Sequence, residues 1–379
     1  MAAHQHITTT YLGQKEKSDP KNIPGTTKYS SEHGLFTMDS FKDLKVDKKL
    51  KVMMIKAANA SLSIDSWSSY KTAWTQFILC GEELDCPMTM TFPASEKALL
   101  TFLAWGVGRK LAGSTIELYL SGIKKIHTVL GLPCIDLRPD LIKSVIKGLK
   151  NQEFMTKKIK RVPMTPSTML LLKRQLFNSD METTDALLFW SVCTASFFGS
   201  LRMGEILSKK STSFDSAFTL LRQDMTIVED DEGFPELNIE LKHSKCYAGK
   251  SEIISIRETK DSLCPVKAFR KFRARTHRQP RDLPAYCGSH RKPLTKAVFA
   301  KTLRALLKPT LGPMALKLSC HSFRAGIPSI LANKGYSELY IKAVGRWSSR
   351  AWTAYASLPR TTRYKVSKKI GKTMKRRSA

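Results

Sequence analysis

From Ala186 to Leu201 the sequence carries no charged residue, and this stretch limits what the chain can fold into more than any other feature. It is shorter than the roughly 20 residues that a membrane span needs, and it contains Ser191, Thr194 and Ser196. A helix that is apolar on every side has to be covered by other parts of the protein. We therefore expect a buried core helix, and a chain with 42% hydrophobic residues can build a core around it.

Apolar residues between positions 51 and 155 recur with a helical period in several short segments. The members of two such faces are Trp67, Tyr70, Trp74, Phe77 and Ile78 in one segment and Ile116, Leu120, Ile123 and Leu130 in another. Short amphipathic helices without strands predict a small bundle whose tryptophans and isoleucines form its core. Lys124 and Lys125 lie beside the second face and are the more exposed candidates for contact with phosphate groups.

Two polar segments flank this bundle. Residues 1–50 show no sustained apolar period, which predicts a flexible arm. Residues 156–166 combine two prolines with four cations, which favours an extended linker between domains. The four cations are Lys157, Lys158, Lys160 and Arg161. Such a linker is either solvated or lies along a phosphate backbone, and the sequence leaves both interpretations open.

A second domain is predicted over residues 167–362. Helical patterns come first, strand-like runs follow near 218–228, 237–241 and 253–256, and helical patterns then return. Turn residues at Asp230–Gly233 and Tyr247–Gly249 separate the strands. The chain is therefore predicted to be mainly α-helical with a small antiparallel β-sheet, as an N-terminal helical bundle followed by an α+β domain.

The charge balance indicates a polyanionic partner. The chain has 63 Lys and Arg residues against 32 Asp and Glu residues, a net charge of +31. A protein this basic binds polyanions through the release of counterions, which makes nucleic acid the leading partner. An anionic membrane is the weaker interpretation because no basic amphipathic helix beside an insertion segment is visible. A merely soluble basic surface is the third.

Other features bear on location and metal binding. Residues 1–10 lack a positive segment followed by an apolar one, so an intracellular protein with reduced cysteines is expected. Cys287 and His290 have the spacing of half a zinc site, but without an evident second pair we expect no metal. The basic tail at 363–379 is read as a nuclear address, a DNA-contacting end or a solvated end.

Residues suited to phosphodiester chemistry occur in the second domain. Cleavage without a metal needs a nucleophile, cations around the non-bridging oxygens and an acid for the leaving oxygen. Arg202 follows the core helix and begins another helix, and Glu205 can hold its guanidinium. His321 and Arg324 lie on one helical face, where both can reach one phosphate. Each short pattern alone is weak, because most such pairs are surface pairs.

The order of these patterns is more specific. Arg-x-x-Glu, a lysine in a strand turn, His-x-x-Arg, Gly-Arg-Trp at 345–347 and then Tyr355 follow one another along the chain. In type, order and approximate spacing they resemble the tyrosine recombinase, or phage integrase, family. The likeness covers residues 167–360, and the preceding helices match the family's core-binding domain in size and position. The Gly-Arg-Trp-Ser-Ser run and Cys-Pro-Val at 264–266 look most similar to eukaryotic mobile-element enzymes of the crypton or DIRS type.

The resemblance implies a mechanism. Tyr355 would attack the scissile phosphate and form a 3′-phosphotyrosyl bond with release of a 5′-hydroxyl. Arg202 and Arg324 would clamp the non-bridging oxygens, while His321 would help to move the tyrosine proton. The protein link would conserve the bond energy, so no ATP would be required. The resemblance also implies no metal and no organic cofactor.

Two of the implied roles have alternatives. Lys245 is favoured as the general acid because it follows a serine at the end of a strand, with Lys242 and Lys250 as rivals. Directly after the glycine, where many family members carry His or Trp, this chain has Arg346. Trp347 comes one residue later and is favoured for that role through its packing and its indole N–H.

As a whole, the resemblance implies a site-specific recombinase or integrase that mobilises a transposable element, in the nucleus if the source is a eukaryote. Its partner would be double-stranded DNA, bound as a homotetramer, with a monomer left open for the free protein. A catalytically silent DNA-binding descendant and a type IB topoisomerase are the alternatives. Tyr340 and Tyr364 are poorer nucleophile candidates because neither follows a glycine at the family's spacing.

Overall fold

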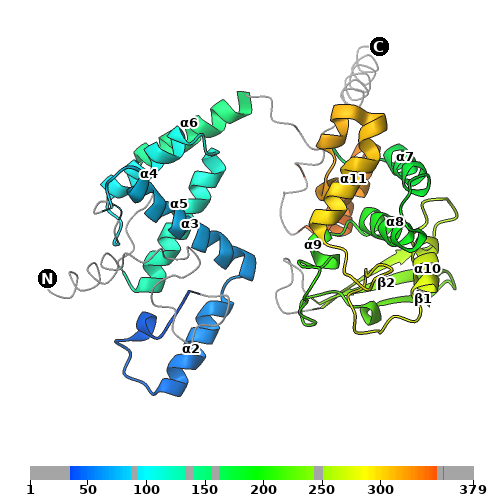
Figure 1. Cartoon of the computed structure of the whole chain (residues 1–379), viewed down its shortest axis with the longest axis horizontal. Coiled ribbons are helices and arrows are strands. Elements are labelled where there is room, and N and C mark those ends of the chain that lie inside the picture. The colour runs from blue at the N-terminus through cyan, green and yellow to red at the C-terminus, as the bar shows by residue number, and fades with distance from the viewer. Residues whose placement is uncertain are drawn as a thin grey trace, which may run out of the picture. The chain divides into compact units, whose positions relative to one another are not determined.

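The structure, a computed structural model, describes residues 35–87, 90, 92–132, 140–155, 162–242, 251–347 and 353. The chain divides into two compact units, residues 1–158 and 159–379 (Figure 1). Both units are helical, and the second adds a three-stranded antiparallel sheet. The predicted fold class is therefore confirmed. None of the helices that the structure describes is long and apolar enough to span a membrane.

Polar side chains set where the helices of the first unit begin. The elements are the 3-10 helix η1 (Asp39–Phe41), α2 (Lys48–Ala60), α3 (Ile64–Glu83), α4 (Glu96–Gly108), α5 (Gly113–Leu130) and α6 (Asp140–Met155). Asp47, Ser63 and Ser95 precede α2, α3 and α4, and each side chain accepts a hydrogen bond from the backbone N–H three residues later. These caps satisfy amides that the first helical turn leaves without an intrahelical partner.

Helices α3 and α5 pack closely at the centre of this unit. At Gly122 on α5, an added Cβ would lie 2.5 Å from Ala73 Cβ and 3.2 Å from Tyr70 Cδ1 on α3. The core around this crossing includes Phe77, Leu99, Phe102, Ile116 and Ile123. The crossing therefore needs a residue without a side chain, which lets the two backbones approach.

We expect Gly122→Ala to lower the free energy of unfolding, because the added methyl group overpacks the crossing of α3 and α5. The overpacking costs about 1–3 kcal/mol, and the better helix propensity of alanine returns up to about 1 kcal/mol. Gly148→Ala on α6 is the matched control, since no other group of the described residues lies within 4 Å of its Cβ position. Urea unfolding of the full chain measures both, and equal effects of the two substitutions would contradict the close crossing.

Two residues that the periodicity placed on apolar faces are exposed instead. Ile78 on α3 is 38% exposed and Leu130 on α5 is 39% exposed, whereas Trp67 and Phe77 are buried. Ile78 is turned by about 100° around the helix axis from the buried Phe77. Leu130 is the last residue of α5, which ends at the left-handed Gly131. Both residues therefore lie at the edge of the face that is buried.

Residues 35–50 belong to the folded unit, although the sequence predicted a flexible arm there. Leu35 and Phe36 are buried in a cluster with Trp67. The side chain of the buried Asn59 accepts from the N–H of Phe36 at 3.0 Å and donates to its carbonyl at 3.1 Å. Two adjacent apolar residues are too few to show a helical period. The sequence pattern therefore could not predict their burial, which depends on partners that come later in the chain.

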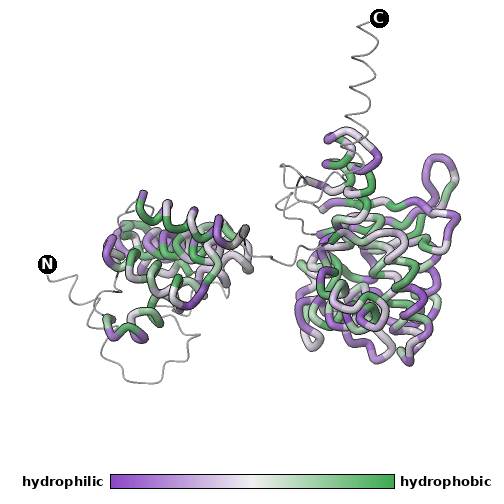
Figure 2. The backbone as a smooth tube through the Cα atoms, turned by 90° about the horizontal axis from the view of Figure 1, so that it is seen from above, coloured by the Kyte–Doolittle hydropathy of each residue, from purple (hydrophilic) through white to green (hydrophobic). Residues whose placement is uncertain are grey.

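The second unit surrounds the uncharged stretch. Its elements are α7 (Pro166–Phe177), α8 (Thr183–Phe198), α9 (Met203–Ile206), the 3-10 helix η2 (Arg222–Asp224), β1 (Met225–Glu229), β2 (Pro235–Leu241), β3 (Glu252–Arg257), α10 (Pro265–Arg275), α11 (Lys296–Leu311), the 3-10 helix η3 (Gly312–Lys317), α12 (Cys320–Lys334) and α13 (Glu338–Gly345). Residues 188–197 of α8 are buried, which confirms the predicted core helix. Helices α7, α10 and α12 pack against it. Figure 2 shows hydrophobic and hydrophilic residues alternating along the helices of each unit.

Close packing brings α12 against α8. A Cβ at Gly326 on α12 would lie 2.5 Å from Cε2 of Phe197 on α8 and 3.0 Å from the Met164 carbonyl. Only a glycine leaves room for this approach. The first turns of α12 are thereby held beside the end of α8.

The sheet covers another side of this core. Its order is β1-β2-β3, with both pairs antiparallel. On β2, the alternate residues Leu237, Ile239 and Leu241 are buried, so one face of the sheet packs on the core. Helix α10 contacts β2 and β3. The sheet thus places the first residue of β3 next to the last residue of β2, where Glu252 pairs with Leu241.

The strand predictions hold with one change. The first predicted run, near 218–228, is a strand only from Met225, because η2 occupies the residues before it. The turn at Asp230–Gly233 is confirmed, with Gly233 at φ 78°. The turn predicted at Tyr247–Gly249 lies outside the described residues.

Candidate active site

Arg202 stands where the chain leaves α8 and begins α9. It is the N-cap residue of α9 and has an extended backbone. The carboxylate of Glu205 accepts hydrogen bonds from the backbone N–H of Arg202 at 2.9 Å and from its Nη1 at 2.7 Å. The side chain of Glu205 is 8% exposed and that of Arg202 is 23% exposed. A buried carboxylate therefore orients a guanidinium that still reaches the surface.

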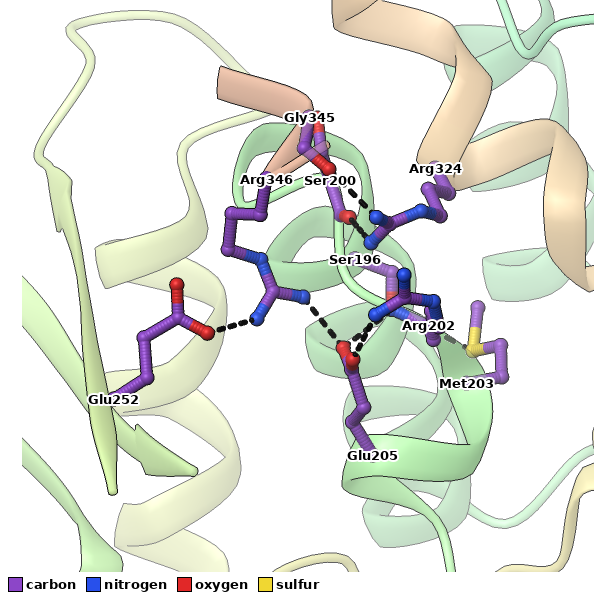
Figure 3. Close-up of polar contacts among 9 residues, drawn as sticks. All are labelled: Ser196, Ser200, Arg202, Met203, Glu205, Glu252, Arg324, Gly345 and Arg346. Carbon is purple, nitrogen blue, oxygen red and sulfur yellow. Dashed lines mark hydrogen bonds and ion pairs between the residues drawn. The ribbon is translucent and has the colours of Figure 1, made fainter. Parts of the chain in front are cut away.

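Arg324, on α12, reaches the turn between α8 and α9 that carries Arg202 (Figure 3). It is 2% exposed, and it donates from Nη1 to the carbonyl of Ser200 at 2.7 Å and from Nη2 to the carbonyl of Gly345 at 2.6 Å. Ser200 precedes Arg202 by two residues, so these bonds bring together two arginines that are far apart in the sequence. The same two bonds also join the turn after α8 to the end of α13.

His321 and Trp347 accompany Arg324. His321 lies on the first turn of α12, one turn before Arg324, and its side chain is exposed. The ring of Trp347 lies 5.2 Å from Cζ of Arg324, which is a cation–π distance. A Cβ at Gly345 would overlap the Trp347 ring. The glycine of the Gly-Arg-Trp run therefore makes room for the indole that covers Arg324.

The side chain of Arg346 points towards two carboxylates. Its Nη1 donates to Glu252 at 2.8 Å and its Nη2 donates to Glu205 at 2.5 Å (Figure 3). Of the two candidates for the position after the glycine, Trp347 packs on Arg324, whereas the side chain of Arg346 is held by acidic groups.

Three groups of this site had no signal in the sequence. The carbonyl oxygens of Ser200 and Gly345 are backbone groups, and backbone acceptors leave no mark on residue type. Glu252 opens β3 and belongs to none of the recognised patterns. Its role appears only when β3 is placed beside the end of α13.

Burial and charge act in opposite directions on Glu205. Burial raises the pKa of this carboxyl, but the guanidinium of Arg346 and the hydrogen bonds from Arg202 and Arg346 outweigh burial. The net effect is a pKa below the usual 4.5. Glu205 is therefore ionised at neutral pH and remains a strong acceptor for both arginines.

This shift predicts an acid-sensitive contribution to stability. A carboxyl with a lowered pKa contributes fully above its unfolded pKa near 4.5 and loses that contribution as the pH falls through the folded pKa. Glu205→Gln removes the titrating group, so the wild type should exceed the variant in stability most at about pH 7 and progressively less below about pH 4. Urea unfolding across this range measures the difference. A difference that stays constant with pH would contradict the prediction.

Some of the predicted residues fall outside the described part of the chain. These are Tyr355, Lys245, Lys250 and the linker cations Lys157, Lys158, Lys160 and Arg161. Among the candidates for the general acid, Lys242 is described, and its Nζ lies 2.9 Å from Oδ2 of Asp224. The ammonium of Lys242 is thus engaged by an ion pair within the second unit, and it also donates to the Ser216 carbonyl at 3.1 Å.

The two predicted phosphate contacts of the first unit differ from each other. Lys124 is exposed on α5. Lys125 has its Nζ 5.1 Å from the ring centre of Phe36 and 5.4 Å from that of Trp67. Cation–π contacts of this kind tie Lys125 to the aromatic cluster and leave Lys124 as the more accessible cation.

The geometry suits an oxyanion. Arg202 offers a partly exposed guanidinium, and Arg324 adds a second positive charge in surroundings from which water is largely excluded. Forked donors of this kind match the oxygens of a phosphate or carboxylate. Charge in such a dry, preorganised place stabilises negative charge more strongly than it does in water.

Comparisons with known proteins support the fold. No family model matches the sequence, and no curated protein matches it. A post-cleavage complex of the XerH site-specific recombinase with a palindromic difH substrate matches with a TM-score of 0.54 and 10% identity, over 89% of this chain and 90% of that chain. A pre-cleavage complex of XerH with difH matches with a TM-score of 0.50 and 14% identity, over 85% and 91%. A lambda integrase dimer bound to a COC′ core site reaches a TM-score of 0.45 at 13% identity, over 94% and 85%. The two XerH complexes reach a TM-score of 0.50 or more, so the chain has the fold of the tyrosine recombinases.

Proposed function

We propose that this protein is a tyrosine recombinase that cleaves and rejoins double-stranded DNA through a 3′-phosphotyrosyl bond to Tyr355. The observation that carries the proposal is the meeting of Arg202 and Arg324 at the turn after α8, where Arg324 donates to the Ser200 carbonyl. The fold supports the same function, because XerH is a site-specific recombinase bound to its difH substrate.

Each group in this site has a role that its chemistry allows. Arg202 and Arg324 neutralise the non-bridging oxygens as negative charge grows on the attacked phosphate. His321, which is exposed one turn before Arg324, accepts the tyrosine proton and hydrogen-bonds the phosphate in this proposal. Lys245 protonates the leaving 5′ oxygen. The phosphotyrosyl bond keeps the energy of the broken linkage, so the reaction needs no ATP. In this proposal the arginines supply the charge stabilisation at the phosphate.

The proposed substrate is duplex DNA, in keeping with the net charge of +31. Exchange between two duplexes needs four strand cuts, which implies a homotetramer on DNA. We further propose that the enzyme mobilises a transposable element of the crypton or DIRS type in the nucleus of a eukaryote.

The test is the capture of the covalent intermediate. The full chain is incubated in EDTA with suicide duplexes taken from the DNA that flanks the gene. Each duplex carries a nick, so that cleavage releases a short fragment with a 5′-hydroxyl, which diffuses away. We expect an adduct that survives denaturant. After trypsin and nuclease digestion, mass spectrometry should find the nucleotide on the peptide Ala351–Arg360, in which Tyr355 is the single tyrosine.

Other outcomes would indicate the alternative functions. Tight DNA binding without an adduct on any duplex would favour a catalytically silent DNA-binding protein. An adduct together with relaxation of supercoiled plasmid, and with no exchange between duplexes, would favour a topoisomerase of type IB. An adduct on a peptide other than Ala351–Arg360 would contradict the assignment of the nucleophile.

A further inference from the structure

Arg346 joins three segments of the second unit that are distant in the sequence. It follows the last residue of α13, and its guanidinium donates to Glu205 on α9 at 2.5 Å and to Glu252, the first residue of β3, at 2.8 Å. The side chains of Arg346, Glu205 and Glu252 are 6%, 8% and 19% exposed. Ion pairs at this depth are screened little by water and salt.

The backbone at Arg346 is unusual for an arginine. Its φ of 52° and ψ of 53° lie in the left-handed region, and it forms the C-cap of α13. Glycine is the residue that normally takes this conformation at a helix end. The side chain of this arginine reaches the two carboxylates, which glycine could not do.

Glu205 connects Arg346 to Arg202. Oε2 of Glu205 accepts from Nη2 of Arg346 and from the backbone N–H of Arg202, while Oε1 accepts from Nη1 of Arg202. Arg346 therefore shares one oxygen of this carboxylate with the backbone of Arg202, while the other oxygen binds the Arg202 guanidinium. In Figure 3 the Arg346 guanidinium lies between Glu252 and Glu205, with Arg202 beyond Glu205.

Arg346 also contributes to the net charge of the site. Arg202, Arg324 and Arg346 carry three positive charges, and Glu205 and Glu252 carry two negative charges, which leaves a net charge of +1. Without Arg346, the two carboxylates would cancel the charges of the other two arginines. Arg346 thus keeps the site cationic as well as holding it together.

We propose that Arg346 is a positioning residue for DNA cleavage. It fixes Glu205, and through Glu205 the Arg202 guanidinium, relative to β3 and the end of α13. The proposal rests on the function proposed above. In the sequence, Arg346 stands nine residues before Tyr355.

A double-mutant cycle separates positioning from net charge. If Arg346 positions Arg202 through both carboxylates, Arg346→Gln should slow single-turnover cleavage roughly 100-fold and Glu252→Gln roughly tenfold. The double variant should then be no slower than Arg346→Gln, because both changes break one linkage. If net charge alone matters, Glu252→Gln should be as fast as the wild type or faster, and the double variant should return to the wild-type rate.

A modified DNA substrate tests whether Arg346 acts on the reaction or only on folding. A methylphosphonate at the scissile position replaces a charged non-bridging oxygen with a neutral methyl group, which removes much of the charge that Arg202 neutralises. We expect the penalty of Arg346→Gln to shrink at least about tenfold on this substrate. An equal penalty on both substrates would mean that Arg346 acts on folding alone, and it would overturn the proposal.

The controls keep this inference apart from the proposed function. Arg257→Gln is the matched substitution at the other end of β3, where Arg257 pairs with Asp230 and Glu232 at the surface, and it should leave cleavage unchanged. Arg346→Lys keeps the charge and should fold, but its single ammonium cannot replace a planar fork between two carboxylates, so it should remain roughly tenfold slow. Wild-type protein that forms no adduct would defeat the proposed function. If the wild type cleaves DNA and both Arg346→Gln and Arg346→Lys cleave it equally fast, only this inference is wrong.

Discussion

Replacing Tyr355 with phenylalanine should abolish the covalent protein–DNA adduct completely. The substitution removes the phenol oxygen that would form the bond to phosphorus, and no other atom of the side chain can attack. DNA affinity should change by no more than about fivefold, because one hydroxyl contributes at most about one hydrogen bond to binding. Adduct formation on suicide duplexes and DNA binding by fluorescence anisotropy measure the two properties separately.

Tyr340→Phe is the matched control for this prediction. It removes the same atom from a tyrosine on α13 that is 61% exposed, and it should leave the adduct at the wild-type level. If the adduct persists in Tyr355→Phe, another residue is the nucleophile, and Tyr364 is the next tyrosine to test. If affinity collapses together with the adduct, Tyr355 acts in DNA binding or folding, and the loss of adduct says nothing about chemistry.

Arg324→Ala should reduce both stability and cleavage. The buried guanidinium donates to the carbonyls of Ser200 and Gly345, and alanine leaves both acceptors without it. Buried groups that lose their hydrogen bonds cost about 1–3 kcal/mol each, so the loss of two should lower the free energy of unfolding by about 2–6 kcal/mol. Loss of a cation beside the attacked phosphate should slow cleavage roughly 1000-fold.

The conservative variant Arg324→Lys separates the effect on stability from the effect on cleavage. Arg324→Lys retains the charge, but an ammonium cannot donate in a planar fork to two carbonyls and a phosphate together. We expect a smaller loss of stability than in alanine and a cleavage rate between those of alanine and wild type. Urea unfolding and single-turnover cleavage, both at a temperature where all variants are folded, provide the comparison.

Arg304→Ala on α11 controls for the loss of one positive charge, because this arginine is exposed. It should keep the wild-type stability within about 0.5 kcal/mol and the wild-type cleavage rate. A stable and active Arg324→Ala variant would show that the site around the Ser200 carbonyl is not where the phosphate binds.

Local sequence patterns were sufficient to predict the helices and strands and the residue types of the site. The uncharged stretch became the buried helix α8, and the strand-like run at 237–241 became part of β2, where Leu237, Ile239 and Leu241 are buried. These features depend on neighbours within one helical turn or one strand, which the sequence records directly. The order of Arg202, His321 and Arg324 likewise indicated one reaction, although it could not indicate which groups touch.

The tertiary structure decided the contacts between distant segments. The sequence determined that Arg346 and Trp347 follow a glycine, but it could not show that Arg346 binds Glu252 on β3 while Trp347 covers Arg324. In the same way, Leu35 and Phe36 carry no period, and their burial depends on Trp67. The physical reason is the same in each case. Periodicity reports which residues share a face of one element, whereas the partner of that face depends on how whole elements pack, and close approaches such as Gly326 against Phe197 settle that packing.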